Sequence, residues 1–557
     1  MKCKVRLQSQ DTLRIQAVMT QFDSEEESKR ESIKSGANVK EKTEVGDSIL
    51  ENASREKEVD LDLENLSNNG KPIINKDVDK AMEIAVEIDS ISLNEKQDKK
   101  LYWKVNLYLL PLICFLYACQ YMDKVTSSYA AIMGIRTYYN MHGDMYSWLG
   151  TAFYLGYLFF VFPATLLLQK YSLSKVTSLF IVLWGALLCL HAVPKGYAGL
   201  ITLRVLLGIC ESIITPAMVI ITSQWYKREE QMFVTAIWFS CNGLGTIIGG
   251  AIAYGLAIHT NSYSITSWKI LFIVTGLMTI VVGIAFYLHM PDDPSKAWFL
   301  SKEEKQRVVL RIRSNEQGFG NPHFKKSQFK EALKDLQTWM FVVLSFAAQV
   351  PNGGMTNFGS ILLNEDFGYS SEESLLMNLP SGAIDIVGCI GLAAFNKRFP
   401  RLLIAVFALA ITLMGACLLA FASSNSAKLA GYYIYNFLPI TMICSLSCFA
   451  SNTAGHTKKI TTNSLYLIAY CVGNLVGPQT FISSQAPDYS GGKISIVVCL
   501  CAALLLTIGI YFIYWNRNRR RDAGKNSSDV LTSVSIMKNR QFADLTDKEN
   551  PYFRYSL

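Results

Sequence analysis

Asn452-Thr-Ala-Gly-His-Thr-Lys-Lys-Ile-Thr-Thr-Asn463 is a short, polar and basic stretch between two long apolar segments. The flanking segments cover about residues 431–450 and 465–482, and neither contains a charged side chain. Each is close to the ~20 residues that one helix needs to cross a bilayer. Basic residues concentrate in the cytoplasmic connections of membrane proteins, so Lys458 and Lys459 predict a cytoplasmic turn. This turn fixes the direction of every other span.

The apolar residues of the chain are abundant and clustered. They make up 50% of the 557 residues, which is typical of a membrane protein rather than of a soluble domain. Runs long enough to cross a bilayer cover residues 103–122, 146–168, 175–193, 199–222, 232–257, 268–290, 337–359, 372–394, 401–421, 429–450, 461–483 and 493–515. We therefore expect an all-α membrane protein with twelve transmembrane helices.

The charged connections define the expected domains. Residues 1–100 hold 17 basic and 22 acidic side chains with few aromatic ones, which predicts a disordered tail. The long connection at 291–336 separates a six-helix bundle at 101–290 from a second one at 337–515, and 516–557 form a second tail. If both tails and this basic central loop are cytoplasmic, about 26 basic residues lie inside and about six outside. Two similar six-helix halves are typical of secondary transporters.

No cofactor or metal site is expected. All thirteen cysteines except Cys3 lie in the apolar runs, and Cys444 and Cys448 have the spacing of one helix face rather than of a zinc site. The chain also lacks the glycine-rich phosphate loop of ATP-driven pumps.

Several motifs occur in order along the spans. They are Leu203-Arg-Val-Leu-Leu-Gly-Ile-Cys-Glu-Ser212, Trp225-Tyr-Lys-Arg-Glu-Glu-Gln231, Asn242-Gly-Leu-Gly-Thr-Ile-Ile-Gly-Gly250, Pro291-Asp-Asp-Pro294, Pro351-Asn-Gly-Gly-Met-Thr-Asn-Phe358 and Gly473-Asn-Leu-Val-Gly-Pro-Gln479. Together they resemble the major facilitator superfamily (MFS), and within it the fungal allantoate permease branch of the anion:cation symporters. The resemblance covers nearly all of residues 103–515 and implies the MFS fold.

Two positions depart from the pattern of that family. The basic glycine-rich loop after the second span is reduced to Gln169-Lys-Tyr-Ser-Leu-Ser-Lys175, and Tyr121-Met-Asp-Lys124 stands where relatives usually have Asp-Arg. Lysine is a point charge without the bidentate fork of arginine, so substrate choice is expected to differ.

Ionisable residues within the spans are the candidate functional groups, because their burial in lipid is costly. Lys124 is expected at the end of the first span, and Arg204 and Glu211 lie seven residues apart on one face of the fourth span. The functional interpretation assigns Lys124 and Arg204 to an anionic substrate and Glu211 to the coupling proton, as the family resemblance implies. The structural alternative is that Arg204 and Glu211 pair with neighbouring helices. Asp385, a second candidate for proton coupling, faces either the cavity or the loop after the eighth span.

The seventh span supplies uncharged candidates for substrate binding. Gln349, Asn352 and Asn357 flank Gly353-Gly354, where we expect a break in the helix that lines a cavity. Asn474 and Gln479 in the eleventh span fit either binding or packing.

The leading hypothesis is a monomeric carrier for proton-coupled uptake of a small organic anion: a carboxylate, ureide, amino-acid-like anion or sulfonate. Its partners would be the anion, protons and the lipid bilayer, with no nucleic acid and no enzymatic activity. The plasma membrane is the expected location, with the endoplasmic reticulum and the vacuole as alternatives. The alternative function is a nutrient sensor that keeps the carrier fold and signals through its tail.

Overall fold

The computed structural model describes residues 95–313, 325–395, 398–523, 546–550 and 553–557. Within these ranges every regular element is a helix and no strand occurs. The tail predicted for residues 1–100 lies almost wholly outside them, as do 314–324 of the central loop and 524–545 of the second tail.

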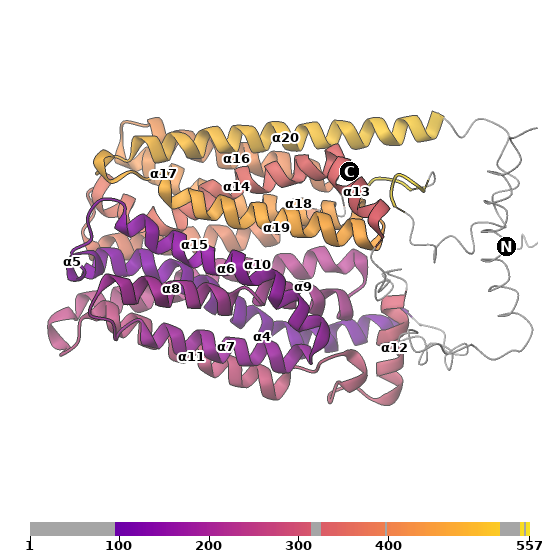
Figure 1. The fold of residues 1–557 in the computed structure, drawn as a ribbon, viewed down its shortest axis with the longest axis horizontal. Coiled ribbons are helices and arrows are strands. Elements are labelled where there is room, and N and C mark those ends of the chain that lie inside the picture. The colour runs from indigo at the N-terminus through magenta and orange to yellow at the C-terminus, as the bar shows by residue number, and fades with distance from the viewer. Residues whose placement is uncertain (1–94, 314–324, 396–397, 524–545, 551–552) are drawn as a thin grey trace, which may run out of the picture. The chain divides into compact units, whose positions relative to one another are not determined.

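The first half of the chain forms one set of membrane-length helices (Figure 1). They are α4 (Glu95–Ala130), which continues as η1 (Ala131–Ile135) and α5 (Arg136–Tyr138), α6 (Met145–Lys170), α7 (Leu173–Leu190), α8 (Tyr197–Glu211) with α9 (Ile214–Trp225), α10 (Arg228–Ile258) and α11 (Ser267–His289).

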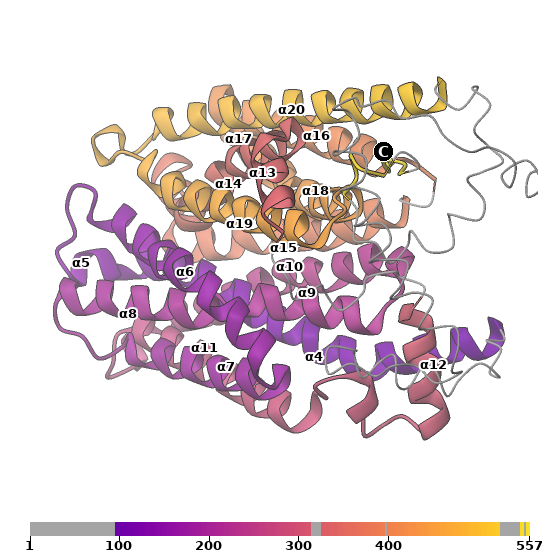
Figure 2. The ribbon, with the colours of Figure 1, turned by 45° about the vertical axis from the view of Figure 1, so that its right-hand side comes forward.

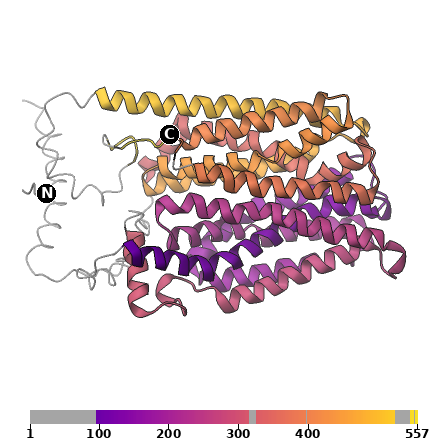
Figure 3. The same ribbon diagram turned by 180° about the vertical axis from the view of Figure 1, so that it is seen from behind.

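The second half repeats this arrangement. Its helices are α14 (Leu336–Ile361) with η4 (Leu362–Asp366), α15 (Ser371–Ala394), α16 (Arg401–Phe421), α17 (Asn425–Tyr435) with α18 (Leu438–Asn452), α19 (His456–Gln479) and α20 (Ser490–Ala523). Seen from behind, the two halves form separate sets of helices along the colour gradient (Figure 3).

The packing within each half follows one scheme. In the first half α4 packs on α10 and α7 on α11, and in the second half α14 packs on α19 and α16 on α20. These are the first and fifth, and the third and sixth, helices of each half. Two pseudo-symmetric six-helix bundles, as expected from the sequence, therefore make up the MFS fold.

Ten of these helices are long and apolar enough to cross a membrane by composition alone. The two others, α14 and α19, complete the set of twelve and are long enough but more polar. They pack on each other along their length. Their amide side chains thus face protein rather than lipid, as buried polar groups require.

The central connection contains two helices, α12 (Lys302–Arg313) and α13 (Lys326–Lys334). Arg311 of α12 pairs with Asp98 of α4 and Glu230 of α10, at 2.5 Å each, so α12 belongs to the first half. Lys458 of α19 pairs with Glu331 of α13 at 2.9 Å, so α13 belongs to the second half. These helices mark the α12/α13 end of the bundle, opposite the α5 end (Figure 1), and Figure 2 again shows α12 far from α5.

The first span is longer than the sequence predicted. The prediction ended it at residue 122, with Asp123 and Lys124 at its boundary, but α4 continues to Ala130 and both side chains lie inside the helix. Charges usually mark the end of a span because lipid excludes them. Here the bundle interior supplies partners for both, so the helix does not end.

The fourth and tenth spans are both interrupted one turn before a proline. α8 ends at Glu211 and α9 begins at Ile214, ahead of Pro216. α17 ends at Tyr435 and α18 begins at Leu438, next to Pro439. Proline has no N–H for the carbonyl four residues earlier, which explains why each helix breaks there.

Polar contacts between the two halves gather at the α5 end. Arg136 pairs with Glu365 at 2.5 Å, and the Tyr146 hydroxyl donates to the carbonyl of Asn357 at 2.8 Å. Ser371 donates to the carbonyl of Ile132 at 3.1 Å. The halves are thus joined by polar contacts across that end.

Candidate functional site

Two charged residues of the first half form a buried ion pair. Lys124 Nζ of α4 lies 2.9 Å from Glu211 Oε1 of α8, and the Glu211 side chain is fully buried. Glu211 is the last residue of α8, directly before the interruption that Pro216 causes. A buried pair is weak evidence for stability, because desolvation offsets most of the attraction. Its presence therefore directs attention to function.

Arg204 takes a different partner from α4. Its guanidinium donates a hydrogen bond to Ser127 Oγ, and its side chain is 3% exposed. Arg204 and Glu211, seven residues apart on α8, thus each contact α4 rather than each other.

Phe272 of α11 supports the guanidinium of Arg204 from the other side. Arg204 lies 5.4 Å from the centre of the Phe272 ring, and His191 stacks on the same ring at 5.1 Å. The side chain of His191, the C-cap residue of α7, is fully buried.

Asp123 belongs to this cluster and was missed as a functional candidate. Its carboxylate accepts a hydrogen bond from Trp184 Nε1 at 2.7 Å, and it interacts electrostatically with Arg204. The signal was present, since Asp123 is an ionisable residue next to Lys124 in an apolar run. Because the sequence prediction placed Asp123 at the end of the span, it was not considered as a functional residue.

Asp123, Lys124 and Arg204 line a pocket of about 300 Å³, open solvent included, which we call the charged pocket. Its lining residues are Asp123, Lys124, Ser127, Leu149, Gly150, Phe153, Tyr154, Arg204, Thr356 and Asn357. Glu211 is not among these lining residues and contacts the pocket's Lys124 as an ion-pair partner. Asn357 and Thr356 come from α14 of the second half, so the pocket lies where the two halves meet.

A second pocket of about 610 Å³, open solvent included, lies mainly against the second half, and we call it the amide pocket. Its lining residues are Tyr121, Val125, Ser128, Thr246, Asn352, Met355, Thr356, Gly359, Ser360, Asn378, Ser381, Asp385, Tyr432, Tyr435, Asn436, Leu438 and Pro439. Thr356 lines both pockets.

Asp385 lies in the lining of the amide pocket, so of the two predicted surroundings the structure places it in the cavity. Its side chain is 5% exposed and accepts a hydrogen bond from Cys389 Sγ at 3.2 Å. No basic side chain is among the described residues that line this pocket.

The three amide side chains predicted on the seventh span do not act as one group. Asn352 lines the amide pocket and Asn357 the charged pocket, whereas Gln349 lines neither. The amide of Asn474 on α19 joins Gln349 and Asn352, with hydrogen bonds of 2.9 Å to each. Gln349 and Asn474 thus join α14 to α19.

The predicted helix break at Gly353-Gly354 is wrong, because α14 is continuous from Leu336 to Ile361. A Cβ atom on Gly353 would lie 2.5 Å from the carbonyl oxygen of Asn474. The glycine therefore permits close contact between α14 and α19 rather than an unwound segment.

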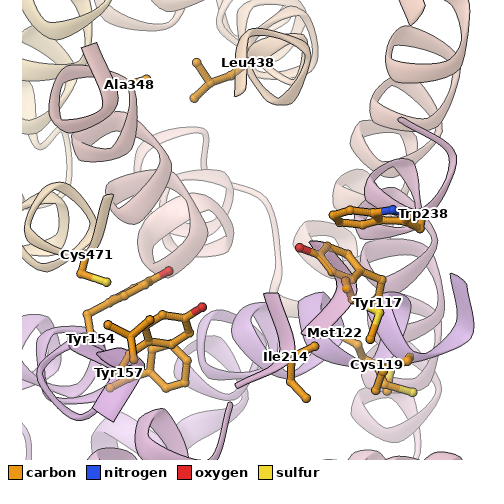
Figure 4. Close-up of a cluster of buried hydrophobic side chains, with 14 of the residues drawn as sticks. Tyr117, Cys119, Met122, Tyr154, Tyr157, Ile214, Trp238, Ala348, Leu438 and Cys471 are labelled. Atoms are coloured by element: carbon orange, nitrogen blue, oxygen red, sulfur yellow. The ribbon is translucent and has the colours of Figure 1, made fainter. Parts of the chain in front are cut away.

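Aromatic side chains continue the interface between the halves beyond the charged pocket. Figure 4 shows Tyr154 and Tyr157 of α6 beside Cys471 of α19, and Tyr117 of α4 beside Trp238 of α10. All five are buried.

Among the described residues, one group of carboxylates has the spacing of a metal site, namely Glu331, Asp335 and Asp547 at the α12/α13 end. Lys458 Nζ lies between them, at 2.9, 2.8 and 2.7 Å from their oxygens. The lysine ammonium therefore occupies the position of a cation.

The sequence model described as Major Facilitator Superfamily matches residues 113–478. The chain is 48% identical over 508 residues to an allantoate permease of Saccharomyces cerevisiae, covering 88% of this chain and 93% of that protein. It is 34% identical to a thiamine pathway transporter of the same yeast, covering 82% and 86% of the two chains. A bacterial homolog of the human lysosomal transporter Spinster, in an inward-facing and occupied conformation, has a similar fold, with a TM-score of 0.54, 15% identity and coverage of 73% and 96%.

The chain therefore belongs to the major facilitator superfamily, and within it to the allantoate permease branch. It is a multi-pass integral membrane transporter of small molecules.

Proposed function

We propose that the protein couples the uptake of a small organic anion to a proton. The charged pocket supports this proposal. Arg204 and Lys124 bring two positive charges, and Asp123 and Glu211 bring two negative ones when both are ionised. A substrate anion adds one further negative charge in a site of low dielectric, where uncompensated charge is costly. Protonation of one carboxylate restores neutrality.

Arg204 is assigned to the substrate carboxylate, since its planar fork can make two parallel hydrogen bonds. The anion competes with Asp123 for Arg204, and Lys124 assists as a point charge. Glu211 is the proposed proton carrier, because its ion pair with Lys124 makes its protonation sensitive to whether Lys124 contacts the anion. Thr356 and Asn357 are the polar residues that the second half adds to the lining of the same pocket.

We place the α12/α13 end and both termini in the cytoplasm, because the basic connections lie at that end. The polar contacts at the α5 end then close the outer side, and the conformation is open toward the inside. Alternating access would separate Arg136 from Glu365 and bring the opposite ends of the halves together. The plasma membrane is the proposed location and the monomer the proposed functional unit.

Uptake by purified protein in lipid vesicles tests the proposal, with allantoate as the first probe because a close relative bears its name. An inward proton gradient should drive accumulation above the external concentration, and a protonophore should abolish it. Accumulation that is independent of the gradient would contradict proton coupling. Specific binding without any flux would favour the alternative, a sensor with the carrier fold.

A further inference from the structure

The C-terminal strap, which comprises residues 546–550 and 553–557, is held on the second half without forming a helix or a strand in these residues. Ser556 and the side chain of Asn452 exchange two hydrogen bonds of 2.7 Å. The N–H of Arg401, the first residue of α16, donates to the carbonyl of Leu557 at 2.9 Å. These contacts join the strap to the ends of α16 and α18. The strap can therefore detach while the transmembrane helices stay folded.

Thr546 begins the strap, and its hydroxyl is enclosed. Its Oγ1 donates to a carboxylate oxygen of Glu331 on α13 at 3.0 Å and accepts the N–H of Glu549 at 3.2 Å. The Glu549 carboxylate accepts the N–H of Thr546 at 2.9 Å, as in a capping box. The Thr546 side chain is fully buried, and its methyl group lies 3.0 Å from the position that a Cβ on Gly455 would take. The docked strap thus leaves no space for a larger group at this hydroxyl.

Added negative charge at Thr546 would meet like charge. A phosphate group carries a charge of about −2 near neutral pH. On Thr546 Oγ1 it would lie against the Glu331 carboxylate and next to Asp547 in the sequence. The nearby cation, Lys458, already pairs with Glu331, Asp335 and Asp547. Phosphorylated Thr546 and the docked strap therefore exclude each other, through repulsion and through lack of space.

Release of the strap leaves the buried lysine of this end with partners. Without Asp547, Lys458 keeps Glu331 at 2.9 Å and Asp335 at 2.8 Å. A buried charge that keeps hydrogen-bonded partners of opposite sign avoids the large cost of an uncompensated charge. The detached state is therefore accessible to the folded protein.

The sequence around Thr546 is acidic, namely Asp544-Leu-Thr-Asp-Lys-Glu549. Acidic side chains stand one and three residues after the threonine. Protein kinases select their acceptors partly by such charge patterns, because basic groups beside the active site pair with acidic side chains of the substrate. Asp547 and Glu549 are engaged within the protein when the strap is docked, and they become available to a kinase when it detaches.

We propose that Thr546 is a phosphorylation site for an acid-directed protein kinase and that its phosphate keeps the strap detached from the α12/α13 end. The hydroxyl oxygen of the detached Thr546 attacks the γ-phosphorus of ATP. A bond forms between this oxygen and the phosphorus, the bond from the phosphorus to the bridging oxygen of ADP breaks, and the hydroxyl proton passes to a base of the kinase. The inference goes beyond transport and rests only on the proposed cytoplasmic position of this end.

Purified full-length protein in detergent, with ATP and casein kinase 2 as the acid-directed kinase, tests the site. Mass spectrometry should find phosphate on Thr546 and on Ser24, whose following Glu25-Glu-Glu27 makes it the internal control for kinase activity. Amide hydrogen exchange of Ser556 and Arg401 should then be faster by about tenfold or more, with the amides of α7 unchanged. Phosphate on Ser24 alone, or on Thr546 without faster exchange, would overturn the proposal.

Loosening the strap should expose the acceptor. Asn452→Ala removes both side-chain hydrogen bonds to Ser556 and leaves the sequence around Thr546 intact. It should raise the rate of phosphorylation at Thr546 about fivefold or more, because this rate follows the detached fraction, and should not change the rate at Ser24. An equal rate at Thr546 in wild type and variant would show that docking does not cover the hydroxyl, and the proposed exclusion would be wrong.

A pair of variants of equal size separates charge from bulk. Thr546→Asp places a carboxylate against Glu331, whereas Thr546→Asn has the same shape without the charge, and both side chains are good caps. Exchange at Ser556 should be at least about tenfold faster in Thr546→Asp than in Thr546→Asn, and Glu331→Gln should reduce this difference. Equal exchange in the two variants would refute release of the strap by charge.

Discussion

The pair of Lys124 and Glu211 shows how a single buried contact ties stability to transport. Glu211 is fully buried and Lys124 is its ion-pair partner at 2.9 Å. Removing one member leaves the other charge without compensation, whereas removing both removes the desolvation cost as well. The pair is therefore expected to be more important for coupling than for folding.

We predict that Lys124→Met destabilises the protein by about 3–5 kcal/mol and that Lys124→Met/Glu211→Gln recovers most of this loss. Thermal unfolding of the detergent-solubilised protein measures both. The double variant should still fail to accumulate substrate, because it lacks the proposed proton carrier. Additive destabilisation in the double variant would show that the two side chains do not depend on each other.

At the scale of elements, the contact of α14 with α19 joins the two most polar spans. Gly353 and Gly477 let the backbones approach, since a Cβ at Gly477 would lie 2.4 Å from the carbonyl oxygen of Val350. Asn474 then bridges Gln349 and Asn352 across the contact.

We predict that Gly353→Ala separates these helices and markedly lowers both the unfolding temperature and the yield of folded protein. Gly391→Ala is the matched control, because Gly391 also lies in a helix and has no atom within 4 Å of an added Cβ. Alanine has the higher helix propensity, so this control should be neutral or slightly stabilising. Equal effects of the two substitutions would refute the packing role of Gly353.

A second element-scale feature is the C-terminal strap, defined as residues 546–550 and 553–557. It packs on the α12/α13 end of the second half, where Ser556 and Asn452 exchange hydrogen bonds of 2.7 Å. Tyr555 stacks on Tyr514 at 4.9 Å. Asp547 completes the carboxylate set around the fully buried Lys458. The basic turn from which the orientation of the spans was predicted is thus partly buried. Its Lys458 joins α19 to α13 and to the C-terminal strap.

We predict that Asp547→Ala lowers the unfolding temperature of the protein by several degrees, and that Arg554→Ala in the same strap does not. Among the described residues Arg554 forms its ion pair with the largely exposed Asp522, a type of contact worth little. A large effect of Arg554→Ala would contradict this ranking.

The effect of Asp547→Ala should not change between about pH 5 and pH 9. Burial alone would raise the pKa of Asp335, but the hydrogen bond and charge of Lys458 lower it below its usual value of 3.8. Burial alone would lower the pKa of Lys458, but Asp547 and Asp335 raise it above its usual value of 10.5. The stabilisation by Asp335 is lost only as the pH falls through its lowered pKa, and that by Lys458 only as the pH rises through its raised pKa. Unfolding temperatures of wild type and variant across this range test the expectation, and a difference that varies with pH would contradict it.

At the scale of the whole molecule, the orientation determines which side loads the substrate. Ser370, in the connection between α14 and α15, is exposed, and so is Glu303 of α12, whose side chain is 77% exposed. The two positions lie at opposite ends of the bundle. Thr457, in the basic turn itself, is 4% exposed, so a cysteine placed there would be poorly accessible to a labelling reagent.

We predict that an impermeant thiol reagent labels Ser370→Cys in intact cells and labels Glu303→Cys only after permeabilisation. The unsubstituted protein, with its native cysteines, is the control for background labelling. Labelling of Glu303→Cys from outside would reverse the orientation, and with it the direction of the proposed open side.

The number and order of the helices follow from the sequence because lipid imposes length and apolarity on each span separately. The sequence predicts even the more polar spans α14 and α19, because their apolar runs are long enough to cross a bilayer. Side-chain partners depend instead on which helices face each other. The seven-residue spacing of Arg204 and Glu211 therefore did not reveal Ser127 and Lys124 as their partners. For the same reason the sequence did not show that Asp123 lies inside the first span, where it was predicted to mark the boundary. Nor did it show that Gly353 permits helix contact, where a helix break was predicted.

The junction at Lys458 also imposes an order on the biogenesis of the protein. Asp547, one of its three carboxylate partners, lies 89 residues later in the chain. Synthesis proceeds from the N-terminus, so α19 and α20 must both enter the membrane before the strap can reach Lys458. Until then, of the carboxylate partners that the structure describes, the ammonium has Glu331 of α13 and the C-cap residue Asp335 alone. The second half of the transporter thus completes its junction at the α12/α13 end only after its last transmembrane helix is in place.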